Sequence, residues 1–227
     1  MTRGMTRSGC FVTGTDTGVG KTVVACAILR ALRARGVGAA GFKPIETGVG
    51  DAGPLDAQAL REAAGGDDDL DLVCPQRFAL AAAPAVAAAA AGVEVDVAAL
   101  DAGFRALRAR HAFVVAEGAG GLLVPVAVDL TMADLAARWS LPLVVVARAS
   151  LGTLNHTRLT LEAAAGRGLE VRGLVISHPG GPLSRADALN LAPLLASPGA
   201  PLLGVVPPLP PGGKPAPDVI DVGPLLE

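Results

Sequence analysis

The sequence predicts an α/β fold in which a mostly parallel, doubly wound sheet is flanked by helices. Short apolar runs alternate with segments of helical periodicity along the chain, which is the order of elements in parallel α/β sheets. The runs are continuously apolar, as expected of strands buried on both faces. Hydrophobic residues make up 51% of the 227 residues and aromatic residues only 3%, so we expect small aliphatic side chains to fill the core.

The apolar runs and the segments between them define the expected elements in order. Strands are predicted at residues 10–14, 38–45, 112–118, 141–147, 171–177 and 201–206. Helices are predicted at residues 21–35, 54–64, 96–110, 131–139, 153–166 and 184–196. The alanine-rich stretch 81–91 predicts a further helix after Pro84, because alanine is the strongest helix former. Residues from Pro207 onward are rich in proline and glycine and predict a loop. No linker divides the chain, so we expect one domain over residues 1–227.

Composition and charge exclude several classes of protein. A net charge of −2 and a pI near 5.9 give no basic surface for nucleic acid. No apolar run approaches the eighteen or so residues needed to span a bilayer, and the first residues lack the pattern of a signal peptide. Cys10, Cys26 and Cys74 are far apart and form no CxxC pair. We therefore expect reduced thiols rather than a zinc site, and a cytoplasmic location.

The segment Gly14–Thr22, GTDTGVGKT, ends like a phosphate-binding loop. A predicted strand precedes it and a predicted helix follows it, so a phosphate would meet the amino-terminal N–H groups of that helix. The usual pattern places a glycine six residues before the lysine, whereas this glycine stands one place earlier. The alternative is a glycine-rich turn that carries a surface lysine.

Two more charged residues follow predicted strands. Lys43 lies in FKPIETG, and Glu117 lies in VVAEGAGG. In open α/β sheets, ligands bind outside the carboxyl ends of the strands. Lys21, Lys43 and Glu117 at three successive strand ends therefore predict one nucleotide site, although each alone would be an ordinary strand-end charge.

These residues resemble the dethiobiotin synthetase family, which is ATP-dependent and acts in biotin synthesis. The matching segments are FVTGTDTGVGKT, GFKPIETG, LDAQAL, VVAEGAGGLLVP, SLGTLNHTRLTLEA and LLGVVPPLP, which span residues 11–209 in the family's order. The family's loop carries its glycine at this earlier place. The resemblance implies a P-loop NTPase fold and a reaction of 7,8-diaminopelargonate, CO2 (or bicarbonate) and Mg-ATP. The family forms a carbamate and then a carbamic-phosphoric anhydride, closes a cyclic urea, and releases dethiobiotin, ADP and phosphate.

The resemblance also implies roles for residues near the phosphates. The phosphates would be wrapped by Gly18, Val19, Gly20, Lys21, Thr22 and Val23. Mg²⁺ would be bound by Thr22, Asp56 and Glu117, and the site would be lined by Gly118, Ala119 and Gly120. Lys43, with Lys21, would stabilise the carbamate and the transferring phosphate as the catalytic lysines. For Asp56, the residue pattern alone favours a helix N-cap.

Other segments are implied to contact the substrate and the base. Thr47 would contact the substrate, and Gly152, Thr153, Leu154 and Asn155 of a partner subunit would hold its carboxylate, which implies a homodimer. Capping is the alternative for Asn155. The family reads the base with an asparagine where this chain has Ser177, followed by His178. A serine lacks the paired donor and acceptor of an amide, so base selectivity is expected to be weak. The segment Pro207, Pro208 and Leu209 matches the family's second base-proximal segment.

Three other functions are consistent with a P-loop. An amidating synthase for a corrin precursor shares the early loop but needs an amidotransferase domain with a nucleophilic cysteine, for which no chain remains. A partition-type ATPase switch carries a signature lysine five residues before the loop lysine, where this chain has Asp16. A nucleotide-binding module without catalysis would not need Lys43 and Glu117.

Overall fold

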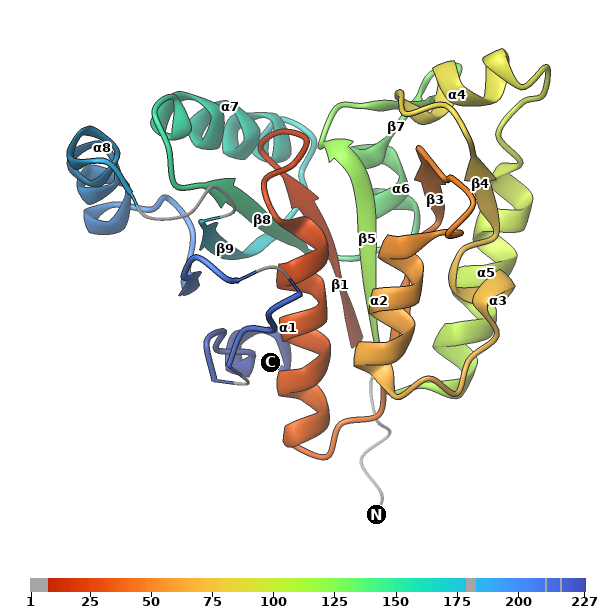
Figure 1. Cartoon of the computed structure of the whole chain (residues 1–227), viewed down its shortest axis with the longest axis horizontal. Helices are drawn as coiled ribbons and strands as arrows, with labels where there is room; N and C mark the ends of the chain where they lie inside the picture. Colours follow the sequence, from red (N-terminus) through yellow and green to blue (C-terminus); the bar gives the residue numbers. More distant parts are fainter. Residues whose placement is uncertain (1–7, 179–182, 211, 217) are drawn as a thin grey trace.

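The centre of the protein is a six-stranded parallel sheet (Figure 1). The computed structural model describes residues 8–178, 183–210, 212–216 and 218–227. The strand order is β10-β9-β8-β1-β5-β2. The strands span Ser8–Gly14 (β1), Ala39–Phe42 (β2), Phe113–Gly121 (β5), Leu143–Arg148 (β8), Val171–Ser177 (β9) and Leu202–Val206 (β10). All six predicted strands are present, and the predicted α/β class is confirmed.

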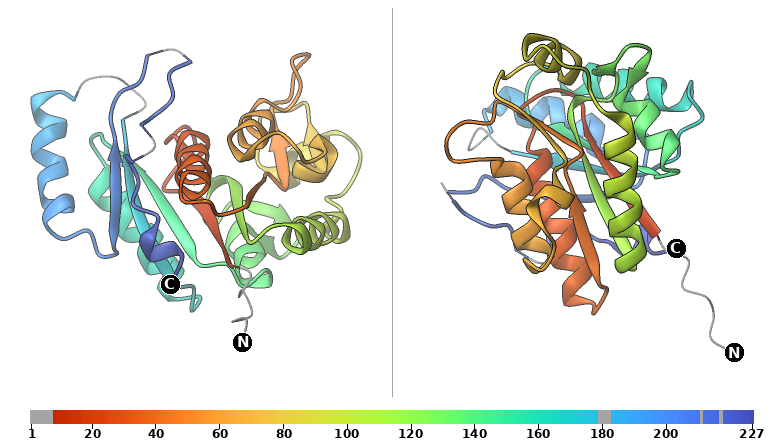
Figure 2. Two further views of the ribbon diagram at one scale, coloured as in Figure 1. Left: turned by 90° about the horizontal axis from the view of Figure 1, so that it is seen from below. Right: turned by 90° about the vertical axis from the view of Figure 1, so that its right-hand side faces the viewer.

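Helices cover both faces of this sheet (Figure 2). Their bounds are Lys21–Ala34 (α1), Leu55–Ala64 (α2), Leu70–Val73 (α3), Pro84–Ala90 (α4), Val97–Arg110 (α5), Met132–Arg138 (α6), Thr153–Ala165 (α7) and Arg185–Ala196 (α8). One buried cluster joins the sheet to α1 and α2, and the other joins it to α4 through α8. Neighbouring residues of β1 pack on opposite faces of the sheet. Phe11 lies in the cluster with α4 through α8, and Val12 lies in the cluster with α1 and α2. Burial on both faces explains why the strands read as continuous apolar runs.

Strand β1 lies inside the sheet between two strands that come much later in the sequence. Ser8 pairs with Phe113 of β5, and Phe11 pairs with Leu143 of β8. All pairings in the central sheet are parallel, so the carboxyl ends of the strands share one edge. The loops after β1, β2, β5 and β9 therefore meet at that edge.

The predicted strand over residues 38–45 is wrong in its second half. Strand β2 ends at Phe42, and the chain resumes as β3, Ile45–Thr47, in a separate parallel pair with β4, Gln76–Phe78. Pro44 has no N–H to continue the ladder. The N–H of Lys43 donates instead to the carbonyl oxygen of Val73, at 2.8 Å. This break turns the chain away from the main sheet directly at Lys43.

Further features differ from the sequence-based expectation, including the short helix α3. A short antiparallel pair, Pro125–Ala127 (β6) with Leu130–Thr131 (β7), was not predicted. The tail after β10 is mostly loop, as predicted, but its end folds back, with a 3-10 turn at Gly223–Leu225. Ile220 pairs with Gly204 of β10, and Val222 is fully buried. The tail therefore covers part of the core near α1.

Within the residues that the structure describes, none of the helices has both the length and the apolar character needed to cross a membrane. The three cysteines are buried and carry free thiols. Burial raises the pKa of Cys10 and of Cys26 to about 12. Neither thiol is therefore suited to be the nucleophile that an amidotransferase needs.

Candidate active site

The loop between β1 and α1 has the backbone of an anion cradle. Gly18 and Gly20 have φ values of 69° and 93°, a region that favours glycine. Helix α1 begins at Lys21 with Gly20 as an N-cap that supplies no side-chain acceptor. The first N–H groups of such a helix are left for an external acceptor, and the helix dipole favours an anion there.

The early glycine of the loop has a steric reason. A Cβ at Gly14 would lie 2.7 Å from the carbonyl oxygen of Asp16 and 2.8 Å from Cγ2 of Val19. The loop folds back over the end of β1 at this point, so a side chain would clash with it. Likewise, a Cβ at Gly20 would lie 2.5 Å from Oγ of Ser177. The displaced glycine is thus required by the shape of this loop.

The Lys21 side chain is held against the loop. Its ammonium donates to the carbonyl oxygen of Asp16 at 3.2 Å, and the residue is only 8% exposed. Burial lowers its pKa, and the nearby charge of Glu117 opposes that shift. An ammonium that is buried with one hydrogen bond keeps donors available for a phosphate.

Lys43 and Glu117 form a buried ion pair beside the loop. The ammonium of Lys43 donates to Oε1 of Glu117 at 2.6 Å and to Oδ2 of Asp56 at 2.9 Å. The side chains of Lys43 and Glu117 are 4% and 0% exposed. The Thr22 hydroxyl donates to the same Oε1 of Glu117, at 3.0 Å. Strand β5, the turn between β2 and β3, and the first turns of α1 and α2 thus bring these groups together.

Burial and pairing act against each other on these groups. Burial raises the pKa of Glu117, while the Lys43 charge opposes the rise. Burial would also raise the pKa of Asp56, but the charge and hydrogen bond of Lys43 outweigh it, so this pKa lies below its usual value. Burial lowers the pKa of Lys43, yet the two carboxylates outweigh burial and raise it overall. Lys43 is therefore held as a cation between two acids.

The predicted position of Glu117 at a strand end is not what the structure shows. Strand β5 continues to Gly121, and Glu117 pairs in register with Val12 of β1. Asp56 also differs from its N-cap interpretation. Helix α2 has Pro54 as its N-cap, and Asp56 lies in the first turn with its carboxylate on Lys43.

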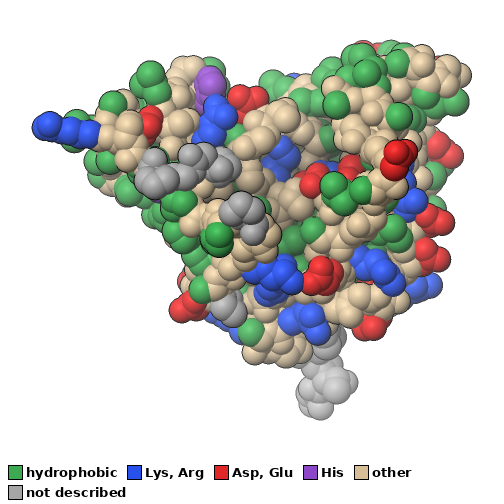
Figure 3. Space-filling model, viewed as in Figure 1, with side chains coloured by type: hydrophobic (Ala, Val, Ile, Leu, Met, Phe, Trp, Pro, Cys, Tyr) green, Lys and Arg blue, Asp and Glu red, His purple; other side chains and the backbone are tan. Residues whose placement is uncertain are grey.

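These side chains line a pocket of about 370 Å³. The sequence-predicted residues on its wall are Gly18, Gly20, Lys21, Thr22, Val23, Lys43, Thr47, Asp56, Glu117, Ala119 and Gly120. Figure 3 shows basic and acidic side chains together in the hollow on this side of the molecule. The side chain of Val19 points instead into the core. Gly118 is buried inside β5 against Phe11.

The pocket wall also contains residues that the sequence analysis did not select, Thr17 and Glu46. Glu46 is 6% exposed, although it lies on a short strand beside a pocket. Its carboxylate accepts the backbone N–H groups of Asp56 and Ala57. No sequence signal points to this role, because Asp56 stands where a capping residue is expected and the amides that Glu46 binds lie ten and eleven positions away.

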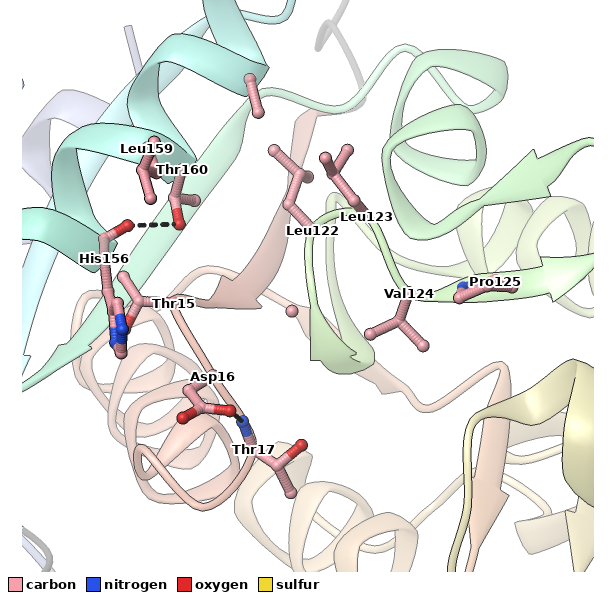
Figure 4. Close-up of a pocket in the computed structure, with 12 residues that line it drawn as sticks. Thr15, Asp16, Thr17, Leu122, Leu123, Val124, Pro125, His156, Leu159 and Thr160 are labelled. Atoms are coloured by element: carbon pink, nitrogen blue, oxygen red, sulfur yellow. Dashed lines mark hydrogen bonds between the residues drawn. The ribbon is translucent and has the colours of Figure 1, made fainter.

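A second, more apolar pocket of about 430 Å³ adjoins the first (Figure 4). The two share Thr17, and the chain passes from Gly120 in the first wall to Gly121 in the second. One side is formed by Leu122, Leu123, Val124 and Pro125, and the other by His156, Leu159 and Thr160 of α7. This apolar lining suits an alkyl chain better than a second phosphate.

The segments predicted near the base lie together beside the loop. Ser177 ends β9 next to Gly20, and the N–H of His178 donates to the carbonyl oxygen of Val206 at 3.1 Å. Val206 is followed directly by Pro207, Pro208 and Leu209. Burial lowers the pKa of His178. These two strand ends are thus adjacent, on the β9–β10 side of the loop.

The segment predicted to hold the carboxylate lies elsewhere. Gly152 is the N-cap of α7 with φ 91°, and Thr153 is buried. Leu154 is half-buried, and Asn155 is exposed. None of these four residues lines the pocket around Lys43. Within one chain, the structure therefore does not bring them to the phosphate end of the site.

The donor set at the loop fits Mg²⁺. This ion takes oxygen ligands, typically one or two carboxylates together with phosphate oxygens and waters. Oε2 of Glu117 is buried and has no hydrogen-bond partner among the described residues. The Thr22 hydroxyl contacts Glu117 and also lowers the pKa of Asp56 through a hydrogen bond. In the described part of the chain, no group of three acidic, histidine or cysteine residues is placed to hold a metal ion.

Comparison with known proteins identifies relatives. The family model described as an AAA domain matches residues 8–216. The ATP-dependent dethiobiotin synthetase BioD of Anaeromyxobacter dehalogenans (strain 2CP-C) is 55% identical over 81% of this chain and 82% of its own length. The proteins of the same name from Aromatoleum aromaticum and Xylella fastidiosa are 43% and 39% identical. They cover 87% and 93% of this chain and 89% and 95% of their own lengths.

Solved structures support the fold alone. The signal recognition particle receptor FtsY from Elizabethkingia anophelis has a TM-score of 0.56 at 17% identity, over 97% of this chain and 64% of its own. The MinC:MinD cell division complex from Aquifex aeolicus has a TM-score of 0.51 at 15% identity, over 92% of this chain and 87% of its own. The dethiobiotin synthetases differ from these distant folds in sequence identity, which is 39–55% over most of the chain. The chain therefore belongs to the ATP-dependent dethiobiotin synthetase family.

Proposed function

We propose that the chain makes dethiobiotin from 7,8-diaminopelargonate, CO2 and ATP, and releases ADP and phosphate. The enzyme is an ATP-dependent ligase of biotin biosynthesis. The observation that carries the proposal is the Lys43 ammonium, which is held between Glu117 and Asp56 beside the phosphate loop. The proposal is also supported by the 55% identity, over 81% of the chain, to the dethiobiotin synthetase of Anaeromyxobacter dehalogenans. We also infer a single domain, because both core clusters share one sheet, and a cytoplasmic location, because the thiols are free.

The proposed mechanism joins two anions, so it needs positive charge. One amine of the substrate takes up CO2 as a carbamate, and a carbamate oxygen attacks the γ-phosphorus while ADP leaves. The second amine then attacks the carbonyl carbon, phosphate leaves, and the urea ring closes. Lys21 at the loop and Lys43 opposite it neutralise the carbamate and the transferring phosphoryl group. Such fixed charges and precise positioning are the main sources of catalysis in phosphoryl transfer.

Mg²⁺ would be held by Thr22, Asp56 and Glu117. When bound, it supplies positive charge to the phosphate oxygens. The chain itself orients the oxygen ligands, since Thr22 contacts Glu117 at 3.0 Å and Lys43 fixes both carboxylates. The Gly18–Val23 segment wraps the phosphates with its backbone amides.

Glu117→Gln is expected to raise the magnesium concentration needed for half-maximal turnover more than it raises the KM for diaminopelargonate. The reason is that an amide loses a negatively charged oxygen ligand but keeps the shape of the side chain. A magnesium titration of turnover measures this. Glu62→Gln is the matched control, because Glu62 is an exposed acid paired with Lys214. An unchanged titration in Glu117→Gln would assign Glu117 to a purely structural role.

The substrate would extend from the phosphate end into the apolar pocket. Thr47 and Thr17 lie on the wall of the first pocket, and Thr17 is shared with the second. The diamine would lie near Thr47, and the alkyl chain would pass between the segment 122–125 and α7. The apolar walls match the methylene groups of a fatty-acid derivative.

We propose a homodimer in which Gly152, Thr153, Leu154 and Asn155 of one subunit bind the carboxylate held in the other subunit's site. These residues lie outside the Lys43 pocket of their own chain. Large apolar side chains near the second pocket are exposed, namely Leu123 at 45%, Leu151 at 75% and Leu159 at 55%. Such a group of exposed apolar residues is typical of an interface. The amino-terminal amides of α7 suit a carboxylate.

Coexpression of Lys43→Ala and Asn155→Ala subunits is expected to recover part of the activity that each variant lacks. A mixed dimer would contain one site with both residues intact. The measurement is turnover of the purified mixed dimer against each homodimer. Failure to recover activity, together with a monomer in sedimentation equilibrium, would contradict the shared site.

Ser177 is expected to give weak base selectivity, because a serine cannot match the donor and acceptor edge of adenine as an amide does. Turnover with ATP, GTP and CTP at subsaturating concentration measures this, and Ser177→Asn is expected to shift the preference toward ATP. A strong preference for ATP in the unsubstituted chain would show that other groups read the base.

The test of the proposed function is phosphate release from Mg-ATP with bicarbonate, with and without diaminopelargonate, while product mass is followed in the same samples. Release that needs diaminopelargonate and gives one dethiobiotin per phosphate supports the proposal. Release that ignores diaminopelargonate would refute it. Stimulation by DNA or lipid vesicles would then favour a partition-type switch.

A further inference from the structure

The first turn of α2 has no cap from its own segment. Its N-cap is Pro54, which provides no side-chain acceptor. The N–H of Ala57 belongs to a fully buried residue, and a buried donor without a partner is costly. Glu46, which lies on the separate strand β3, accepts this N–H at 2.9 Å with Oε2. Its Oε1 accepts the N–H of Asp56 at 3.0 Å.

The hydrogen bond from the N–H of Asp56 to Glu46 also fixes the direction in which the Asp56 side chain points. The peptide N–H of Asp56 is held by Glu46, and the carboxylate of Asp56 reaches Lys43 at 2.9 Å. Glu46 follows Lys43 by three positions, on the strand that starts where the chain leaves the main sheet. One short segment therefore supplies Lys43 directly and sets the position of Asp56 through the backbone of α2. A carboxylate at a helix N-terminus also gains from the helix dipole.

We propose that Glu46 is a positioning residue for the magnesium and nucleotide site, acting through the first turn of α2 to hold Asp56 against Lys43. Each of its two oxygens accepts a backbone amide of α2, which is the contact expected of a positioning residue. The inference rests on the proposed role of Asp56 as a magnesium ligand. It adds an outer contact that orients a metal ligand, a kind of contact whose loss typically weakens metal affinity 10–100-fold.

The experiment compares Glu46→Ala with Asp96→Ala as a matched control. Asp96 caps α5 by accepting the N–H of Ala99 at 2.9 Å, away from the pocket. Both variants are expected to lower the melting temperature. Only Glu46→Ala is expected to weaken binding of Mg-ADP relative to metal-free ADP, by about 10-fold in calorimetry. Glu46→Gln keeps one acceptor and is expected to fall between the unsubstituted chain and Glu46→Ala.

A double-variant cycle decides whether Glu46 acts through Asp56. In the Asp56→Asn background, Glu46→Ala is expected to cause little further loss of magnesium dependence. A full additional loss would overturn the proposal. So would a Glu46→Ala variant that binds Mg-ADP as tightly as Asp96→Ala does, or one that changes only the KM for diaminopelargonate. Because binding of ADP needs no diaminopelargonate, this test can succeed or fail independently of the dethiobiotin reaction.

Discussion

Lys43→Ala is expected to lower turnover by at least ~10²-fold, the scale of removing one preorganised charge that stabilises a transition state. The ammonium lies 2.6 Å from Glu117 and 2.9 Å from Asp56, opposite the phosphate loop. Lys214→Ala is the matched control, because Lys214 is an exposed lysine paired only with Glu62 among the described residues. Steady-state turnover of the two variants measures the effect, and near-normal turnover in Lys43→Ala would remove this residue from the chemistry.

The same substitution has a consequence for stability. Without Lys43, Glu117 and Asp56 lose the cation between them, and leaving a buried charge unpaired commonly costs about 3–5 kcal/mol. We therefore expect Mg²⁺ to raise the melting temperature of Lys43→Ala more than that of the unsubstituted chain. This measurement separates a folding defect from a catalytic one. An equal response of both proteins to Mg²⁺ would mean that the ion does not bind at the two carboxylates.

Lys21→Ala is expected to lose at least ~10²-fold in turnover as well, but through a different interaction. Lys21 starts α1 and donates to the loop carbonyl of Asp16 at 3.2 Å, so its charge faces the place where the β- and γ-phosphates would lie. Nucleotide binding should therefore weaken in Lys21→Ala, whereas Lys43→Ala should bind ADP nearly as the unsubstituted chain does. Calorimetry with ADP distinguishes the two variants. Equal ADP affinity in both would contradict the separate roles.

Much of the fold could be predicted because burial leaves a direct signal in the sequence. The continuous apolar runs of β1, β8 and β9 reflect strands covered on both faces, and the helices between them differ by only a residue or two from their predicted bounds. The break at Lys43 was missed because an apolar run does not reveal where pairing stops. Pro44 marks the end of the pairing, since proline has no N–H to donate to a neighbouring strand.

The site residues could be predicted where a charged side chain stands at a position that rarely holds one for structural reasons alone. Charged residues next to apolar runs, at the edge where ligands bind, indicated Lys21, Lys43 and Glu117, although Glu117 lies inside β5 rather than after it. Glu46 was not found, because its partners are backbone amides that lie ten and eleven positions further along in α2, and their alignment depends on β3. The spacing of Asp56 alone suggested a cap, and the structure instead places its carboxylate against Lys43. Its role toward Mg²⁺ comes from the family resemblance and stays a prediction.

The central place of β1 has a consequence for synthesis of the chain. This strand is synthesised long before its neighbours, β5, which starts at Phe113, and β8, which starts at Leu143. Until β5 has been made, an apolar strand with two open edges has no native partner. Parallel pairing between such distant segments is slow to form. The nascent chain thus carries its phosphate loop well before the neighbouring strands can hold that loop in place, and protection by a chaperone would matter most during this interval.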